Sequence, residues 1–131
     1  MNPEELLFAE SHEWAHIAEQ DGQKIATIGI SANAVEALTD LVYMDLPNTG
    51  TQVSASQSFG EVESVKATSE MYSPVDGEII DVNTSLPDNL EILNSDPYGE
   101  GWIIKVKLSS EDGLSKLIDY AAYQKQCDES H

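Results

Sequence analysis

The sequence contains no arginine, and 24 acidic residues outnumber its six lysines, which gives a formal net charge of −18 at pH 7. A chain with this charge repels phosphate groups, so nucleic acids and anionic membrane surfaces are excluded as partners. We expect transient protein partners that carry basic surface patches. An acidic proteome, halophilic or otherwise, is the alternative explanation for the excess of carboxylates.

Cysteine and long hydrophobic runs are also scarce. The single cysteine, Cys127, allows no internal disulfide and indicates a reducing compartment. No stretch approaches the ~20 apolar residues that a membrane helix needs. The first five residues include two glutamates and no base, unlike a signal or mitochondrial transit peptide. The sequence thus predicts a cytoplasmic, bacterial and monomeric protein.

Residue combinations that support catalysis or metal binding are missing as well. His12 and His16 would lie roughly 13 Å apart on a strand that rises ~3.3 Å per residue, which is too far for one zinc ion. Gly99-Glu100-Gly101 is too short for a nucleotide-binding loop and is typical of a turn. Cys127 has no evident histidine partner. We therefore expect no catalytic residue and no metal site.

Short segments of alternating polarity dominate the chain. In Lys24–Ile30 the residues Ala26, Ile28 and Ile30 fall on one face, as in a half-buried strand. In Trp102–Leu108 every second residue is apolar, starting with Trp102, and two lysines occupy the opposite face. Two further strands are expected, at Leu41–Leu46 and Glu78–Val82.

Helical spacing is found in three places. Ser31 is a suitable N-cap for a short helix, and Pro87–Asn94 fits another. A terminal amphipathic helix is predicted from the spacing of Leu114, Leu117, Ile118, Ala121 and Ala122. At 131 residues the chain suits one domain, with a β core at about 11–109 and a helical segment at about 110–128.

Lys66 is the only basic residue between Lys24 and Lys105, and its neighbours are acidic or small. A solvated surface lysine is the ordinary interpretation of such a residue. Periodicity does not place the segment, because Phe59, Val62 and Val65 recur every third residue and fit a short helix as well as a hairpin.

The residues around Lys66 closely resemble the lipoylation motif of glycine cleavage H proteins. The motif is Phe59-Gly60-Glu61-Val62-Glu63-Ser64-Val65-Lys66-Ala67. Five more blocks resemble the same family in the same order: Ser11-His12-Glu13-Trp14, Ala26-Thr27-Ile28-Gly29-Ile30, Leu46-Pro47, Ser73-Pro74-Val75-Asp76-Gly77-Glu78 and Asp96-Pro97-Tyr98-Gly99-Glu100-Gly101-Trp102. The resemblance covers nearly the whole chain from about Ser11.

The lysine motif resembles lipoylated domains more than biotinylated ones. Lipoyl domains typically have a glutamate three residues before the lysine and a glycine eleven after it, which match Glu63 and Gly77. Biotinyl domains usually carry methionine on both sides of the lysine, whereas Val65 and Ala67 stand here. The resemblance therefore implies that lipoate is attached to Lys66 and that the lipoate-attaching enzyme recognises Glu63 and Gly77.

The family resemblance also implies a fold and a role. The fold is mainly β, a barrel-sandwich hybrid of the lipoyl/biotinyl kind with short peripheral helices, and the lysine stands at a hairpin tip between Ser64 and Thr68. Ser11, Glu13 and Glu70 are expected to line a cleft for the loaded lipoyl arm. The role is that of a carrier, not an enzyme. The implied partners are the lipoate-attaching enzyme, glycine decarboxylase with pyridoxal phosphate, aminomethyltransferase with tetrahydrofolate, and dihydrolipoamide dehydrogenase with FAD.

Some positions depart from the family pattern. Many H proteins carry histidines in the segment that matches residues 31–40, whereas this chain has Asn33 and Ala37 there, and Thr39 replaces a common glycine. Two alternatives to glycine cleavage stay open at this point. One is an H-like lipoate carrier that serves sulfur oxidation or relays lipoyl groups, and the other is an interaction module in which Lys66 is unmodified.

Overall fold

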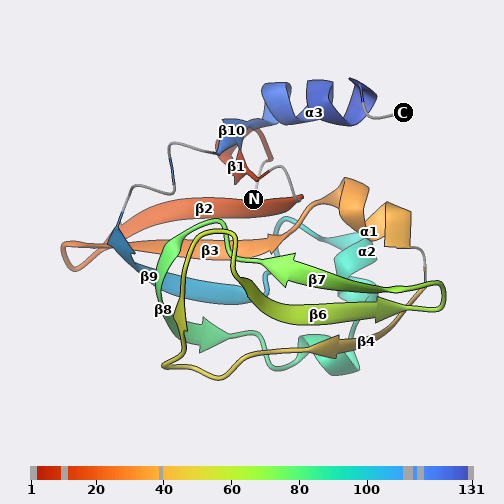
Figure 1. Ribbon diagram of the computed structural model, residues 1–131, viewed down its shortest axis with the longest axis horizontal. Coiled ribbons are helices and arrows are strands. Elements are labelled where there is room, and N and C mark those ends of the chain that lie inside the picture. The colour runs from red at the N-terminus through yellow and green to blue at the C-terminus, as the bar shows by residue number, and fades with distance from the viewer. Residues whose placement is uncertain (1–2, 10–11, 39, 111–113, 115–116, 130–131) are drawn as a thin grey trace.

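Two antiparallel sheets make up most of the computed structural model, which describes residues 3–9, 12–38, 40–110, 114 and 117–129 (Figure 1). The larger sheet has the strand order β10-β1-β2-β3-β9-β8-β5, and the smaller one has the order β4-β6-β7. The bounds in the larger sheet are β1 Leu7–Phe8, β2 Glu13–Gln20, β3 Gln23–Ile30, β5 Gln52–Val53, β8 Asp76–Val82, β9 Ile104–Ser110 and β10 Ile118–Asp119. Those in the smaller sheet are β4 Leu41–Asp45, β6 Ser58–Ser64 and β7 Thr68–Tyr72.

The longest strand pairing is the β2–β3 hairpin. It forms because apolar and polar residues alternate in β3 and because Asp21 and Gly22 can form a tight turn. Asp21 and Gly22 have φ angles of 53° and 77°. These positive values are those of the two-residue turn whose twist matches that of the flanking strands. Ala26, Ile28 and Ile30 of β3 are buried in the main core, which confirms the face predicted from the sequence.

The main hydrophobic core includes side chains from both sheets. β3 and β9 contribute Ile28 and Val106, both fully buried, and the smaller sheet contributes Val62 and Met71, each 1% exposed. Because the two sheets share this core, burial of apolar surface holds the small sheet against the large one.

The short helices lie at the periphery of the sheets, as predicted (Figure 1). They are α1 at Ala32–Leu38, α2 at Glu91–Ser95 and α3 at Tyr120–Glu129, with 3₁₀ turns η1 at Pro3–Glu5 and η2 at Leu86–Asp88. Ser31 caps α1 as expected, because its hydroxyl accepts the Ala34 N–H at 3.1 Å. None of the helices in the described part of the chain is long and apolar enough to cross a membrane.

The C-terminal prediction is wrong in its boundaries. β9 continues to Ser110, Ile118 and Asp119 form β10, and α3 begins only at Tyr120. The reason is that β10 pairs with β1, which satisfies backbone groups that a helix would otherwise use internally. Among the described side chains of α3, Tyr123 and Cys127 are buried.

A second correction concerns Trp102. The strand predicted to begin there begins at Ile104, and the Trp102 ring lies 5.0 Å from Lys105 Nζ instead of sharing the face of Ile104. Trp102 packs against a second hydrophobic cluster beneath α3, which contains Phe8, Trp14 and Tyr123. The turn predicted for Gly99–Gly101 is present.

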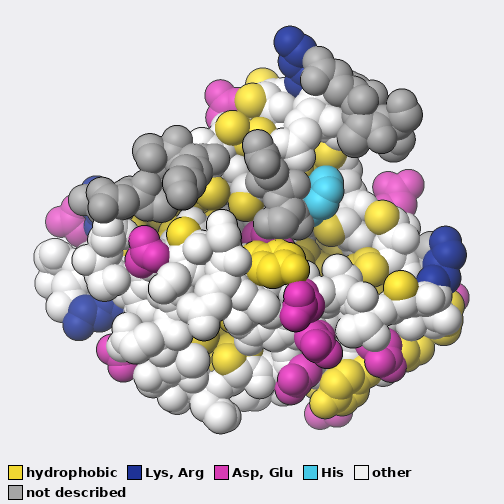
Figure 2. Space-filling view, viewed as in Figure 1, with side chains coloured by type: hydrophobic (Ala, Val, Ile, Leu, Met, Phe, Trp, Pro, Cys, Tyr) yellow, Lys and Arg dark blue, Asp and Glu magenta, His cyan; other side chains and the backbone are white. Residues whose placement is uncertain are grey.

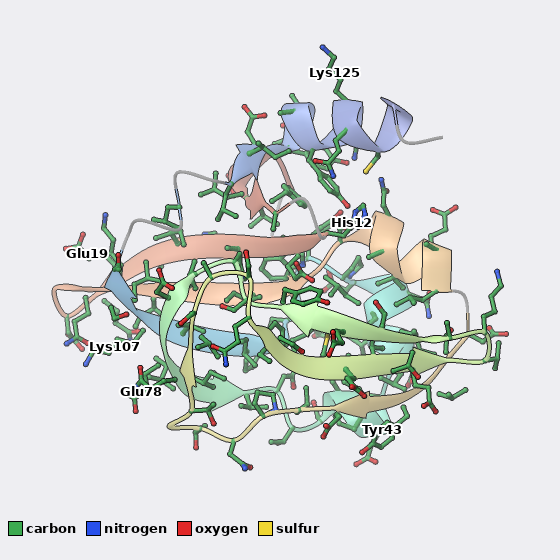
Figure 3. The ribbon with its side chains drawn as sticks, viewed as in Figure 1. His12, Glu19, Tyr43, Glu78, Lys107 and Lys125 are labelled. Carbon is green, nitrogen blue, oxygen red and sulfur yellow. The ribbon has the colours of Figure 1, made fainter. Side chains whose placement is uncertain are left out.

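A buried polar group fixes α3 to the start of β2. The Tyr123 hydroxyl lies 2.6 Å from His12 Nδ1 and 2.6 Å from Ser31 Oγ, and the Tyr123 ring stacks on Phe8 at 4.5 Å between centroids. Figure 3 shows His12 between β2 and α3. Burial lowers the pKa of His12 and raises that of Tyr123, so both side chains are neutral at pH 7.

We predict that Gly77→Ala destabilises the fold. A Cβ at Gly77 would meet the Lys107 carbonyl oxygen and lie 2.7 Å from Val106 Cγ1, so β8 and β9 would have to separate. Such overpacking costs about 1–3 kcal/mol, which urea unfolding followed by tryptophan fluorescence would measure. Gly22→Asn is the control, because nothing lies within 4 Å of a Cβ there and Asn tolerates the positive φ. Equal losses at the two positions would contradict the steric explanation.

Candidate functional site

Lys66 lies at the exposed tip of the β6–β7 hairpin. The turn at residues 65–67 follows β6, and the side chains of all three are exposed. In Figure 1 this tip projects at one end of the molecule, beyond the arrowhead of β6. The position expected for Lys66, in an exposed turn between Ser64 and Thr68, is therefore the one observed.

The hairpin itself explains why periodicity could not place this segment. The pairing of β6 with β7 shifts register between Ser58 and Gly60, which marks a bulge. The extra residue in β6 lets Phe59 and Val62 both face the core although they are three positions apart. The three-residue spacing thus arises from a bulged strand and not from a helix.

Ser64 fixes the backbone of the turn, a role that the sequence analysis missed. Its buried hydroxyl donates to the Ala67 carbonyl at 3.1 Å and accepts the N–H groups of Lys66 and Ala67, each at 3.2 Å. Its N–H donates to the same carbonyl at 2.8 Å. A serine two residues before the lysine is the available sequence signal, because serine hydroxyls commonly close local turns. The lysine side chain is therefore presented from a fixed backbone.

Glu63 and Gly77, the two predicted recognition residues, lie in different parts of the fold. Glu63 is exposed on β6 next to the turn, where Thr68 Oγ1 donates to its Oε1 at 3.2 Å. Gly77 is in β8 of the larger sheet, and its missing side chain is explained by the close approach of β9. Glu63 therefore belongs to the β6–β7 hairpin that carries Lys66. Packing against β9 is enough to explain why residue 77 is a glycine.

Two of the three predicted cleft residues contact the same tyrosine. Glu13 is 2% exposed, and its carboxylate accepts the Tyr72 N–H at 3.1 Å. Glu70 is exposed and accepts the Tyr72 hydroxyl at 2.9 Å. The third predicted residue, Ser11, lies outside the described residues. Tyr72 was not identified from the sequence, since its importance depends on contacts across the two sheets.

The charge of the two glutamates acts on Tyr72. The hydrogen bond to Glu70 and the negative charge of Glu70 raise the pKa of the Tyr72 hydroxyl, with smaller contributions from burial and from Glu13. Tyr72 is therefore a neutral donor at physiological pH. This arrangement concentrates negative charge and hydrogen-bonding groups, which suits a protonated amine as the bound group.

Metal chemistry has no support in the described residues. No group of three or more histidine, cysteine, aspartate or glutamate side chains among them is placed to hold a metal ion. The chemistry offered by the hairpin is instead that of an exposed primary amine, which can be acylated.

A family model described as glycine cleavage H-protein matches residues 6–130. The chain belongs to the glycine cleavage H-protein family. The glycine cleavage system H protein of Rhodopirellula baltica is 58% identical over 129 residues, which are 98% of this chain and 97% of that protein. The mitochondrial H protein 2 of Arabidopsis thaliana is 49% identical over 125 residues, 95% of this chain and 78% of that protein.

The crystal structure of an H protein from Mycobacterium marinum has the same fold. It matches with a TM-score of 0.87 and 36% identity, and the match covers 97% of this chain and 99% of that one. The expected fold class, a mainly β barrel-sandwich hybrid with short peripheral helices, is thereby confirmed. Membership of the H-protein family also confirms the predicted role as the lipoyl carrier of glycine cleavage.

Proposed function

We propose that Lys66 is the lipoylated residue and that the chain carries the aminomethyl group of glycine from glycine decarboxylase to the aminomethyltransferase. The observation that supports this proposal is the exposed lysine on a turn closed by Ser64. The residues fit the group, because the Lys66 amine is accessible for amide formation and lies outside the core. The dithiol would then be reoxidised by dihydrolipoamide dehydrogenase.

The fixed hairpin serves the carrier role by keeping the body of the protein outside the partner's active site. From Cα to sulfur a lipoylated lysine spans roughly 14 Å, at about 1.25 Å of advance per bond. When attached, the group would supply a disulfide that is reduced as it takes up the aminomethyl group in the enzyme with pyridoxal phosphate. It would give up the carbon in the enzyme with tetrahydrofolate, and the resulting dithiol would give up two electrons in the enzyme with FAD. The protein contributes position and transport.

Glu13, Glu70 and Tyr72 are proposed to hold the amine of the loaded arm. Glu70 is four residues from Lys66 along the hairpin, or about 13 Å at ~3.3 Å per residue, which is within reach of the arm. The two carboxylates would bind the ammonium through charge-assisted hydrogen bonds and limit its contact with water. An arm without the amine lacks these contacts and would be released.

We predict that lipoylation is confined to Lys66. Intact-mass spectrometry of protein from lipoate-replete cells should show one lipoyl group, and Lys66→Arg should abolish it because guanidinium is not acylated. Glycine-dependent release of carbon dioxide in the reconstituted system should fall to background. Lys24→Arg and Lys105→Arg are the controls, and a lipoyl group found on either residue with Lys66 unmodified would overturn the assignment.

We predict that the lipoate-attaching enzyme reads the charge of Glu63. Glu63→Gln should slow modification by about tenfold, the effect of losing one charge-assisted hydrogen bond. The variant should keep its stability, because Gln can still accept the Thr68 hydroxyl. Glu61→Gln is the matched comparison, since Glu61 is exposed on the same strand but lies farther from the lysine and should slow modification less. Equal rates for the two variants would mean that Glu63 is only part of the hairpin surface.

We predict that Glu13→Gln weakens protection of the aminomethyl group. Wild type, Glu13→Gln, Glu70→Gln and the control Glu61→Gln are fully lipoylated, loaded with methylamine, and followed for formaldehyde release without other proteins. Release should be about tenfold faster in the first two variants, because each loses one charge-assisted contact. The thermal unfolding temperature of Glu13→Gln should equal that of wild type, because the Gln side chain can still accept the Tyr72 N–H. Release at the wild-type rate from Glu13→Gln would show that this carboxylate does not hold the amine.

A further inference from the structure

Exposed hydrophobic side chains gather beside the tip of the β6–β7 hairpin. Four large hydrophobic side chains are exposed in the described part of the chain, and three of them are Val42, Tyr43 and Val65, at 52%, 55% and 65%. The fourth, Ile80, is on β8 of the other sheet. We call the three residues Val42, Tyr43 and Val65 the tip patch.

A bulge in β4 explains why two consecutive residues of a strand are both exposed. Leu41 pairs with Ser64 and Tyr43 with Glu63, so β4 advances two residues where β6 advances one. Val42 is therefore the extra residue, and the bulge re-aims the side chains on this edge strand. Figure 3 shows Tyr43 on the outer side of β4, away from the core. Bulges of this kind are common next to functional sites.

The backbone holds the patch next to Lys66. The Val65 N–H donates to the Asp40 carbonyl at 3.0 Å, which continues the pairing of β4 with β6 into the turn. Val65 also precedes Lys66 directly in the sequence. In Figure 2 hydrophobic side chains run along the edge formed by β4 toward the hairpin tip, where a basic side chain protrudes.

Carboxylates border the patch on the same face of the small sheet. Glu63 lies opposite Tyr43, and the next row across the sheet places Asp45 opposite Glu61, which in turn pairs with Glu70. Figure 2 shows acidic side chains close together on this sheet. Like charges directly opposite one another destabilise a sheet, so this row has a cost in stability. A partner that covers the patch must therefore have an apolar centre and a basic rim.

We propose that the tip patch is the docking surface for the enzyme that attaches lipoate to Lys66, an inference that rests on the proposed function. The reach of the side chain decides between the partners. Unmodified lysine extends only about 6 Å from Cα to Nζ, so the attaching enzyme must come into contact with the hairpin tip. Enzymes that use the finished arm of roughly 14 Å can act without covering it.

The test compares Tyr43→Ser with the control Ile80→Ser, which truncates an exposed hydrophobic side chain of the other sheet. Lipoylation of the unmodified proteins by a purified lipoate–protein ligase, with lipoate and ATP, is measured as a function of carrier concentration. Tyr43→Ser should raise the KM for the carrier about five-fold with unchanged kcat, since a truncated contact residue weakens docking and not chemistry. Added salt should raise the wild-type KM as well.

Further measurements distinguish between the proteins that could cover the tip patch. An unchanged KM for Tyr43→Ser overturns the docking surface, whereas a wild type that is not lipoylated overturns the proposed function itself. Fully lipoylated Tyr43→Ser should support wild-type rates with the decarboxylase and the aminomethyltransferase. A five-fold rise in KM with either enzyme would assign the patch to that partner instead. Dimers of the wild type that Tyr43→Ser dissociates in analytical ultracentrifugation would assign it to a second copy of the chain.

Discussion

A partly buried hydrogen bond between the two sheets is the contact on which the site depends. The carboxylate of Glu13, at the start of β2, accepts the Tyr72 N–H at the end of β7. A carboxylate that is 2% exposed needs donors of this kind, because burial without them is costly. The bond therefore fixes the end of the hairpin against the large sheet. The same contact orients the hairpin whose tip carries Lys66, together with the residues proposed to hold the amine.

Much of the large sheet could be predicted from the sequence, because β3 is a strand in which every second residue faces the core. In the small sheet the strand β4 was expected, at Leu41–Leu46. The β6–β7 hairpin could not be predicted from periodicity, since a bulge in β6 changes which residues face inward. Only the family resemblance placed Lys66 on a hairpin. The chain after Ser110 was misjudged because apolar spacing does not show that Ile118 and Asp119 pair with β1.

Candidate site residues could be identified from the sequence where they belong to a motif. Residues whose role depends on contacts in the folded chain could not. Lys66 and Glu63 were identified as candidates because their spacing matches a motif. Ser64 and Tyr72 were missed because their roles arise from hydrogen bonds that only the folded chain makes. Gly77 was chosen as a candidate for its spacing from Lys66, and the close approach of β9 explains on its own why this position in β8 is a glycine.

Lys66 is the only cation of the hairpin, so the net charge of the carrier would change when this lysine is modified and again when the arm is loaded. Acylation of Lys66 would remove one positive charge and take the formal charge from −18 to −19. A protonated amine held between Glu13 and Glu70 would bring it back to −18. The change occurs on a face crowded with carboxylates, where one charge alters the local potential most. Partners with basic surfaces could thus distinguish an empty carrier from a loaded one by electrostatics alone, before any contact with the arm.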